Sequence, residues 1–191
     1  TSAGVINIIT AASSKELTAK SELTLGDYET FGASGLVSGP IANGVYASLF
    51  GAARTREGFT SVRTGAGPRG ENHDNNQNFY TTRAQLLFEP NADVSLRFIA
   101  DYTKRNEDCC VGVQLSVGQS PVGRGQFINQ VRPGSIDLTS TPFDRVGFAN
   151  RPTDQRVVDK GLSGELNWAL TPEIEMTAIT AVREWRATMG Q

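Results

Sequence analysis

The chain has 191 residues, of which 38% are hydrophobic and 20% charged, and its formal net charge is −2. This near-neutral balance, without a basic patch interleaved with aromatic residues, argues against a nucleic-acid-binding protein. No segment approaches about 18 consecutive apolar residues, which excludes a transmembrane helix. A transmembrane β-strand needs an apolar residue only at every second position, so the composition permits a membrane protein built from strands.

Alternating strands are predicted from the start of the chain. A short strand over 4–10 (GVINIIT) is followed by strands over 15–26, 30–37 and 45–54. In the strand over 15–26, Leu23 and Leu25 share one face while Lys20 and Glu22 share the other, which is a period of two. The link over 38–44 is rich in turn-forming residues and is predicted to be a turn throughout.

The clearest hairpin is predicted around a turn at Pro90-Asn91-Ala92. A pairing of Glu89 with Asp93 places Phe88 opposite Val94, and one face of the hairpin is then apolar while the other carries charge. The last two strands are predicted over 161–170 and 174–186.

The lengths of the connections alternate. Those at 39–44, 90–92 and 171–173 are short, whereas two polar, irregular connections, near 58–78 and 108–158, run to roughly 20 and 50 residues against a usual median of about 4 to 6. Short turns at one end and long loops at the other are typical of up-and-down membrane barrels. The sequence therefore predicts an all-β fold, part of an antiparallel up-and-down transmembrane β-barrel. Since about seven strands leave two open edges, and the chain runs from Thr1 to Gln191 without a signal peptide, we expect a piece of a longer protein.

Several stretches, in order along the chain, carry a resemblance to a known family: GVINIIT at 4–10, VSGPI at 37–41, RTREGF at 54–59, QLLFEP at 85–90 and ADY at 100–102. In this order they resemble the TonB-dependent outer-membrane receptors. The resemblance implies a plugged barrel of about 22 strands. Residues 1–12 would be the last strand of the plug domain and its link, and residues 13–191 the N-terminal part of the barrel.

The resemblance also implies a function. The complete protein would be a transporter in the outer membrane of a Gram-negative bacterium, taking up a scarce nutrient, above all a ferric siderophore, with energy from the TonB complex. It would carry out no covalent chemistry and would need no cofactor or bound metal, and its other partner would be outer-membrane lipid. Two alternatives stay open: a passive porin-like barrel and a soluble β-sandwich binding module.

Two sets of residues are candidates for contacts. Inward-facing polar residues are expected to line the barrel wall, and by resemblance most of them would hold the plug: Lys20, Glu22, Arg83, Gln85, Arg97, Asp101, Glu165 and Asn167. Arginines give the longer loop a positive component that suits an anionic iron chelate, and the candidates for substrate contact are Arg124, Arg132, Arg145 and Arg151.

Three further features of the loops invite a chemical interpretation. Cys109 and Cys110 stand where an extracellular loop begins, so we expect a structural disulfide between neighbours rather than a redox or metal-sensing pair. The segment Gly65–Gly70 matches G-x-G-x-x-G but neither leaves a strand nor opens a helix, so a flexible loop is the better interpretation. His73 is the only histidine, and it is predicted to be a solvated loop residue rather than a metal ligand.

Overall fold

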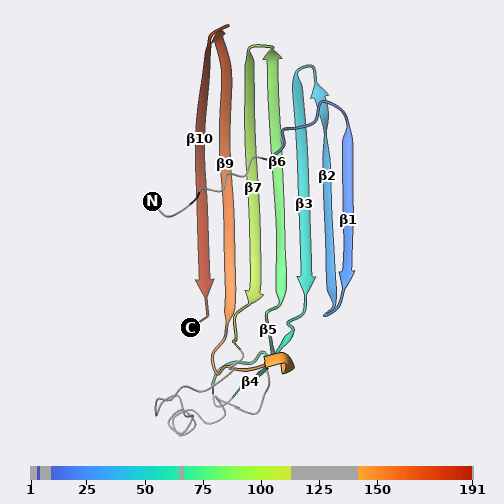
Figure 1. Cartoon of the computed structure of the whole chain (residues 1–191), viewed down its shortest axis with the longest axis vertical. Helices are drawn as coiled ribbons and strands as arrows, with labels where there is room; N and C mark the ends of the chain where they lie inside the picture. The colour runs from blue at the N-terminus through green and yellow to red at the C-terminus, as the bar shows by residue number, and fades with distance from the viewer. Residues whose placement is uncertain (1–3, 5–9, 65–66, 113–141, 191) are drawn as a thin grey trace.

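Seven long strands form one antiparallel sheet (Figure 1). The computed structural model describes residue 4 and residues 10–64, 67–112 and 142–190. The sheet has the order β1-β2-β3-β6-β7-β9-β10, and its strands are β1 Thr18–Gly26, β2 Thr30–Ala42, β3 Val45–Arg56, β6 Gln77–Asn91, β7 Val94–Asp108, β9 Asp154–Thr171 and β10 Ile174–Met189. Each strand pairs with its neighbour along the chain in this sheet, so the prediction of an all-β, up-and-down arrangement of about seven strands is confirmed at this level.

Helix contributes little to the described residues. A single 3-10 turn, η1 Pro142–Asp144, is the one helical element among them. No helix in these ranges has the length and apolar character required to cross a membrane.

A second, three-stranded sheet lies beyond one end of the large sheet (Figure 1). It consists of β4 Thr60–Arg63 in the centre, β5 His73–Asp74 antiparallel to it, and β8 Val146–Phe148 parallel to it. The ends of the large sheet therefore differ. The end that carries this small sheet is called the loop end below, and the opposite end, with the connections at 43–44, 92–93 and 172–173, is called the turn end.

The turns at the turn end are tighter than predicted. Strand β2 continues through Pro40 to Ala42, so the link over 38–44 is mostly strand and only Asn43 and Gly44 form the turn. Gly44 adopts a φ of 69°, which an L-residue with a side chain rarely takes.

The predicted register of the hairpin between β6 and β7 is wrong by two residues. Phe88 pairs with Leu96 rather than with Val94, because the turn lies at 92–93 and the ladder is irregular between Phe88 and Asn91. Pro90 lies in this irregular stretch and has no N–H to give to a ladder. Since a shift of two residues keeps each side chain on its face, the predicted separation of apolar and charged faces is retained.

The long connections contain more regular structure than predicted. The connection over 58–78 includes β4 and β5, and the connection over 108–158 includes η1, β8 and the first residues of β9. Their prediction as irregular loops is therefore wrong at these elements and holds for most of the other described residues of the two connections. Residues 113–141 of the second connection lie outside the described residues, as does the predicted plug strand except for Gly4 and Thr10.

The two faces of the large sheet differ in chemistry. The ladder Val37–Leu49–Ala84–Ala100–Leu162 runs across one face, called the apolar face below. Its large side chains are open: Leu23 is 75% and Leu162 60% exposed. A hollow of about 820 Å³ lies on this face above small residues such as Gly39 and Gly164.

The opposite face, called the polar face, is partly covered by the chain itself. Residues 10–14 cross it, and Gln85 Nε2 donates to the Ala11 carbonyl at 3.2 Å and to Ser13 Oγ at 3.4 Å. The Ser14 amide donates to Ser38 Oγ at 2.8 Å. Ser13, Ser38 and Gln85 are buried here, and Leu87 of β6, on the same face as Gln85, is only 5% exposed. The covered part of this face therefore combines hydrogen bonds with a buried leucine.

Candidate functional site

All eight residues predicted to line the wall lie on the polar face. Lys20, Arg83 and Asp101 belong to one ladder across the sheet, which runs Lys20–Leu36–Phe50–Arg83–Asp101–Gly161–Arg183. The strand registers place five more residues an even number of positions from this ladder, and so on the same face: Glu22, Gln85, Arg97, Glu165 and Asn167.

An ion pair joins β7 and β9 near the turn end of the polar face. The Arg97 guanidinium donates to Glu165 Oε2 and, at 3.4 Å, to the Thr10 carbonyl. Asn167 Nδ2 donates to Glu165 Oε1 at 3.0 Å and Asn167 Oδ1 accepts from the Thr177 hydroxyl at 2.8 Å. This chain of contacts connects the crossing segment with the last strand of the sheet.

A second group of charges lies nearer the loop end and centres on Arg183 of β10. Its Nη2 contacts both carboxylate oxygens of Asp101 at 3.0 Å, and its Nη1 contacts Asp159 at 2.7 Å. The sequence analysis did not identify Arg183. Arg83 lies directly across from Asp101 on the neighbouring strand. Because the Asp101 carboxylate is bound by Arg183, it forms no ion pair with Arg83.

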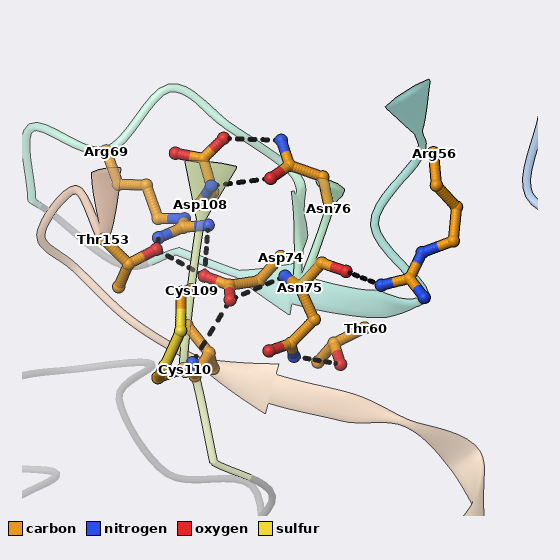
Figure 2. Close-up of a disulfide and its surroundings, with 11 residues drawn as sticks. Arg56, Thr60, Arg69, Asp74, Asn75, Asn76, Asp108, Cys109, Cys110 and Thr153 are labelled. Carbon is orange, nitrogen blue, oxygen red and sulfur yellow. Dashed lines mark hydrogen bonds and ion pairs between the residues drawn. A yellow bond between two sulfur atoms is a disulfide. The ribbon is translucent and has the colours of Figure 1, made fainter. Parts of the chain in front are cut away.

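The most buried charged residues lie at the loop end, in the connections (Figure 2). Arg69 Nη2 lies 3.1 Å from Asp74 Oδ2, and the two side chains are only 1% and 0% exposed. The same guanidinium donates to Thr153 Oγ1 at 2.6 Å and to the carbonyls of Glu71 and His73 at 2.9 and 3.0 Å. A buried arginine with this many acceptors meets the condition under which a buried charge is tolerated.

Asp74 is equally well bound. Its Oδ1 accepts from the Asn75 amide at 2.8 Å and from the Val111 amide at 3.3 Å, and its Oδ2 accepts from the Thr153 hydroxyl. The contacts come from the connection between β3 and β6 and from that between β7 and β9, and they converge on the carboxylate (Figure 2). We call Arg69, Asp74 and Thr153 the loop-end cluster.

Two asparagines extend this cluster toward the large sheet (Figure 2). Asn76 Nδ2 donates to the Asp108 carboxylate at 3.0 Å, and the Asp108 backbone amide donates to Asn76 Oδ1 at 2.6 Å. Asn75, with a φ of 66°, donates to Thr60 Oγ1 at 2.8 Å and accepts at its carbonyl from Arg56 at 2.7 Å. The small sheet and the ends of β3, β6 and β7 are thus joined by polar contacts.

The two cysteines form a disulfide bond between neighbouring residues directly after β7. The Cys109 amide donates to the Thr153 carbonyl at 3.0 Å, and the amide of Val111, just after the pair, donates to Asp74. The backbone at both ends of the disulfide is therefore hydrogen-bonded to residues of the loop-end cluster (Figure 2).

The arginines predicted to meet a substrate do not converge. Arg145 donates to the Tyr28 hydroxyl and lies over the rings of Tyr28 and Phe59, at 5.8 and 5.6 Å from their centres. Arg151 has an exposed side chain, and only its carbonyl reaches the cluster. Arg124 and Arg132 lie outside the described residues.

The interpretation of 65–70 as a flexible loop is wrong for Arg69, which is buried and bonded to four residues besides Asp74. His73 has an exposed side chain, but its backbone belongs to β5 and pairs with Ser61. Arg69 and Asp74 stand five residues apart in a stretch without periodicity, and Thr153 is far away in sequence. No sequence pattern marked them as partners.

Among the described residues, no group of three or more His, Cys, Asp or Glu side chains is placed to hold a metal ion.

At the turn end, Lys15 Nζ lies 2.6 Å from Glu89 Oε2. The hydrogen bond to that carboxylate, together with its negative charge, raises the pKa of Lys15.

The chain matches no protein-family model, and comparison with curated proteins and with solved structures finds no significant match either.

Proposed function

We propose that this chain forms part of the wall of an outer-membrane β-barrel, and that the complete protein is a TonB-dependent receptor for a scarce nutrient such as a ferric siderophore. The observation that carries the proposal is the seven-stranded meander with one open apolar face, one polar face, and its long connections at one end. A membrane barrel needs all three properties: lipid outside, water or a plug inside, and loops on the outer surface.

The extent of the apolar face suits a bilayer. In β7 the outward positions are apolar or aromatic from Val94 to Tyr102, and the next one is Lys104. This stretch of nine residues covers about 26 Å along the strand at about 3.3 Å per residue. A tilted strand of that length crosses most of an apolar band about 25 Å tall.

Aromatic residues border this apolar stretch at both ends. Tyr80 and Tyr102 stack at the loop end with ring centres 5.8 Å apart, and Trp168 lies near the turn end, 43% exposed. Aromatic girdles in these positions are a general property of strands that cross outer membranes. Outward positions carry charge on the same cross-strand ladders as the tyrosines: Lys104 and Arg186 on the ladder of Tyr80, and Lys160 on that of Tyr102.

The edges of the sheet support a larger assembly. Strands β1 and β10 are the outermost, and on its outer side neither pairs with any described residue. Unpaired backbone groups cannot be left in lipid, so the proposed barrel requires further strands that pair with both edges.

The crossing segment supports the plug. Residues 10–14 reach the polar face and are bound there by Gln85, Arg97 and Ser38. This is the position expected for a link between a plug inside a barrel and the first strand of its wall. The dependence on TonB rests on the family resemblance of the sequence motifs.

The membrane orientation is tested with the two tryptophans, which lie on opposite faces. Trp168 is on the apolar face, and Trp185 pairs with Asp159 on the polar face. Variants that keep one tryptophan, Trp185→Phe and Trp168→Phe, are reconstituted in vesicles that contain brominated lipid. We expect quenching of Trp168 and little quenching of Trp185, and equal quenching of the two contradicts a lipid-facing apolar side.

The transport function is tested in cells. Iron-limited cells with the complete gene, cells without the gene and cells without TonB are compared for uptake of radiolabelled ferric siderophores. We expect uptake to require both the gene and TonB. Uptake that needs the gene but not TonB favours the porin-like alternative, and a protein found in the soluble fraction favours the β-sandwich module.

A further inference from the structure

We propose that Arg54, Arg83 and Arg105 form a binding site on the polar face for a small ligand with several carboxylate groups. This inference rests on the proposed function, since the polar face must line a water-filled interior for a solute to reach it. Of the three arginines, only Arg83 was predicted from the sequence to lie on the wall, where it was expected to contact the plug. The ligand proposed here is a small solute instead.

The registers bring the three arginines to one region of the sheet. Arg54 and Arg105 both pair with Phe79, one from each side, so their Cα atoms are two strand spacings apart, about 10 Å. Arg83 follows four residues after Phe79 on β6, about 13 Å along the strand. Arginine side chains are long enough to bring three guanidinium groups toward a common ligand across these distances.

In the described part of the chain, two of the three arginines, each half-buried, contain a buried donor atom without a partner. Nε is buried without a hydrogen-bond partner in both Arg54 and Arg83. Among the described residues, no ion pair or hydrogen bond engages either side chain. Arg105 is exposed, and its Cζ lies over the ring of Phe79, 5.5 Å from the ring centre. Unpaired buried donors are uncommon and call for an explanation.

The acidic residues closest to Arg83 are engaged by another cation. Asp101, directly opposite Arg83, and Asp159 are both bound by Arg183. Two further carboxylates of this face, Glu22 and Glu107, form no ion pair among the described residues. None of the three arginines therefore has a carboxylate bound to it in the described wall.

Between the arginines lies a pair of hydroxyl groups. Thr81 and Thr103 face each other on β6 and β7, and their Oγ1 atoms are 2.7 Å apart. Their ladder is adjacent to that of Arg54, Phe79 and Arg105 and also to that of Arg83. Hydroxyl groups in the centre of a ring of arginines can hydrogen-bond further oxygens of the same ligand.

The location favours a solute over a segment of the plug. Residues 10–14 contact Gln85 and Arg97, on the turn-end side of Arg83. The arginines lie on the other side, toward the loop end, where a ligand that enters between the loops arrives first. Planar guanidinium groups bind carboxylates through two parallel hydrogen bonds, so a chelate with several free carboxylates matches three arginines better than a neutral one.

The test uses the protein purified in detergent and citrate as the probe, with inorganic phosphate and a neutral sugar for comparison. Binding is measured by calorimetry, and the Nε–H signals of ¹⁵N-labelled arginines are followed by NMR. We expect citrate to bind more tightly than phosphate and to move the signals of Arg54 and Arg83. Removal of one guanidinium in Arg83→Gln or Arg54→Gln should weaken citrate binding about 10- to 100-fold.

Two control variants carry the same change of charge. Lys104→Gln and Arg186→Gln each remove a cation from the apolar side of the sheet, opposite to the proposed site. We expect much smaller losses of affinity in both. The proposal is overturned if the controls lose as much affinity for citrate as the site variants, or if citrate does not bind. It is also overturned if a carboxylate of the plug binds the Nε–H groups of Arg54 and Arg83 in the absence of ligand.

The outcome is separable from that of the proposed function. If brominated lipid quenches Trp168 and uptake requires TonB while citrate does not bind, only the arginine site fails. If citrate binds through Arg54 and Arg83 but Trp168 and Trp185 are equally quenched, the anion site stands and the membrane orientation fails.

Discussion

The large sheet and the loop-end cluster are stabilised in opposite ways. In the sheet, large apolar side chains on one face are open, and Leu25 is 79% exposed. In the loop-end cluster, the charged residues Arg69 and Asp74 are fully enclosed and hydrogen-bonded to each other and to their neighbours. In the sheet, large hydrophobic side chains are exposed, whereas in the cluster charged side chains are buried.

This inversion indicates which surroundings each region requires. The sheet derives its order from backbone ladders, and its apolar face needs an apolar environment that the described residues do not supply. The loop-end cluster provides its own enclosure, as a structure exposed to water must. The comparison suggests that lipid affects the stability of the sheet strongly and that of the cluster weakly.

The largest effect is expected when the buried ion pair is broken. Asp74→Ala leaves the Arg69 guanidinium buried without its carboxylate and should destabilise the small sheet by about 3 to 5 kcal/mol. Hydrogen exchange of β4, β5 and β8 measures this, with β2 and β3 as internal references. The double variant Asp74→Ala with Arg69→Met should recover part of the loss. Equal loss of protection throughout the large sheet would contradict the independence of the two regions.

The next effect concerns the apolar face. Leu162→Lys places a charge where we propose lipid and should destabilise the folded protein in a bilayer by about 2 to 4 kcal/mol. The neighbouring variant Ser163→Lys directs the same side chain to the polar face and should have a much smaller effect. Urea unfolding in vesicles measures both. Since Leu162 is already 60% exposed, equal tolerance of the two lysines would mean that this face meets water.

Glycine substitution separates the two regions on a smaller scale. A Cβ at Gly58 would lie 2.5 Å from the Asp74 carbonyl oxygen and 2.8 Å from its amide nitrogen, whereas a Cβ at Gly51 of β3 would meet nothing within 4 Å. Gly58→Ala should therefore destabilise the loop end by about 1 to 3 kcal/mol, and Gly51→Ala should be nearly neutral. Limited proteolysis of the connections and thermal unfolding measure the two variants, and similar effects would argue against the close packing at Gly58.

The smallest effect is a pH dependence at the turn end. Glu89 raises the pKa of Lys15, so the stabilisation from this contact is fully present below the ordinary lysine pKa of about 10.4 and is lost as the pH rises through the higher folded value. A titration of ¹⁵N-labelled Lys15 Nζ measures the shift, and Glu89→Gln should remove it. Because Lys15 and Glu89 lie at the turn end, the loop-end cluster should respond neither to this titration nor to Glu89→Gln.

Local patterns predicted most of the sheet because its interactions are local. The alternation around Leu23 and Leu25, or around Leu162 and Leu166, shows the period of two in any short window of sequence. Consecutive strands of a meander also pair with each other, so their order follows from the positions of the turns. Register was harder, since the turn lies at 92–93 rather than at 90–92 and the ladder is irregular between Phe88 and Asn91.

The loop-end cluster was not predictable in this way. Asp74 and Thr153 are 79 residues apart, and nothing in either local stretch indicates that they meet. Arg183 is similarly distant from Asp101, by 82 residues. Such contacts form only after the sheet has brought its connections to one end, so they depend on the whole fold.

The sequence by itself determined the strands, their two chemically distinct faces and the end at which the long connections lie, because these follow from side-chain alternation and turn residues close together in the chain. Only the tertiary structure decided which charges are paired: Arg183 binds Asp101, Arg69 binds Asp74, and Arg54 and Arg83 are left without partners among the described residues. The physical reason is that an ion pair depends on a few ångströms between side chains, and that distance is set by strand register and by connections between residues far apart in the sequence.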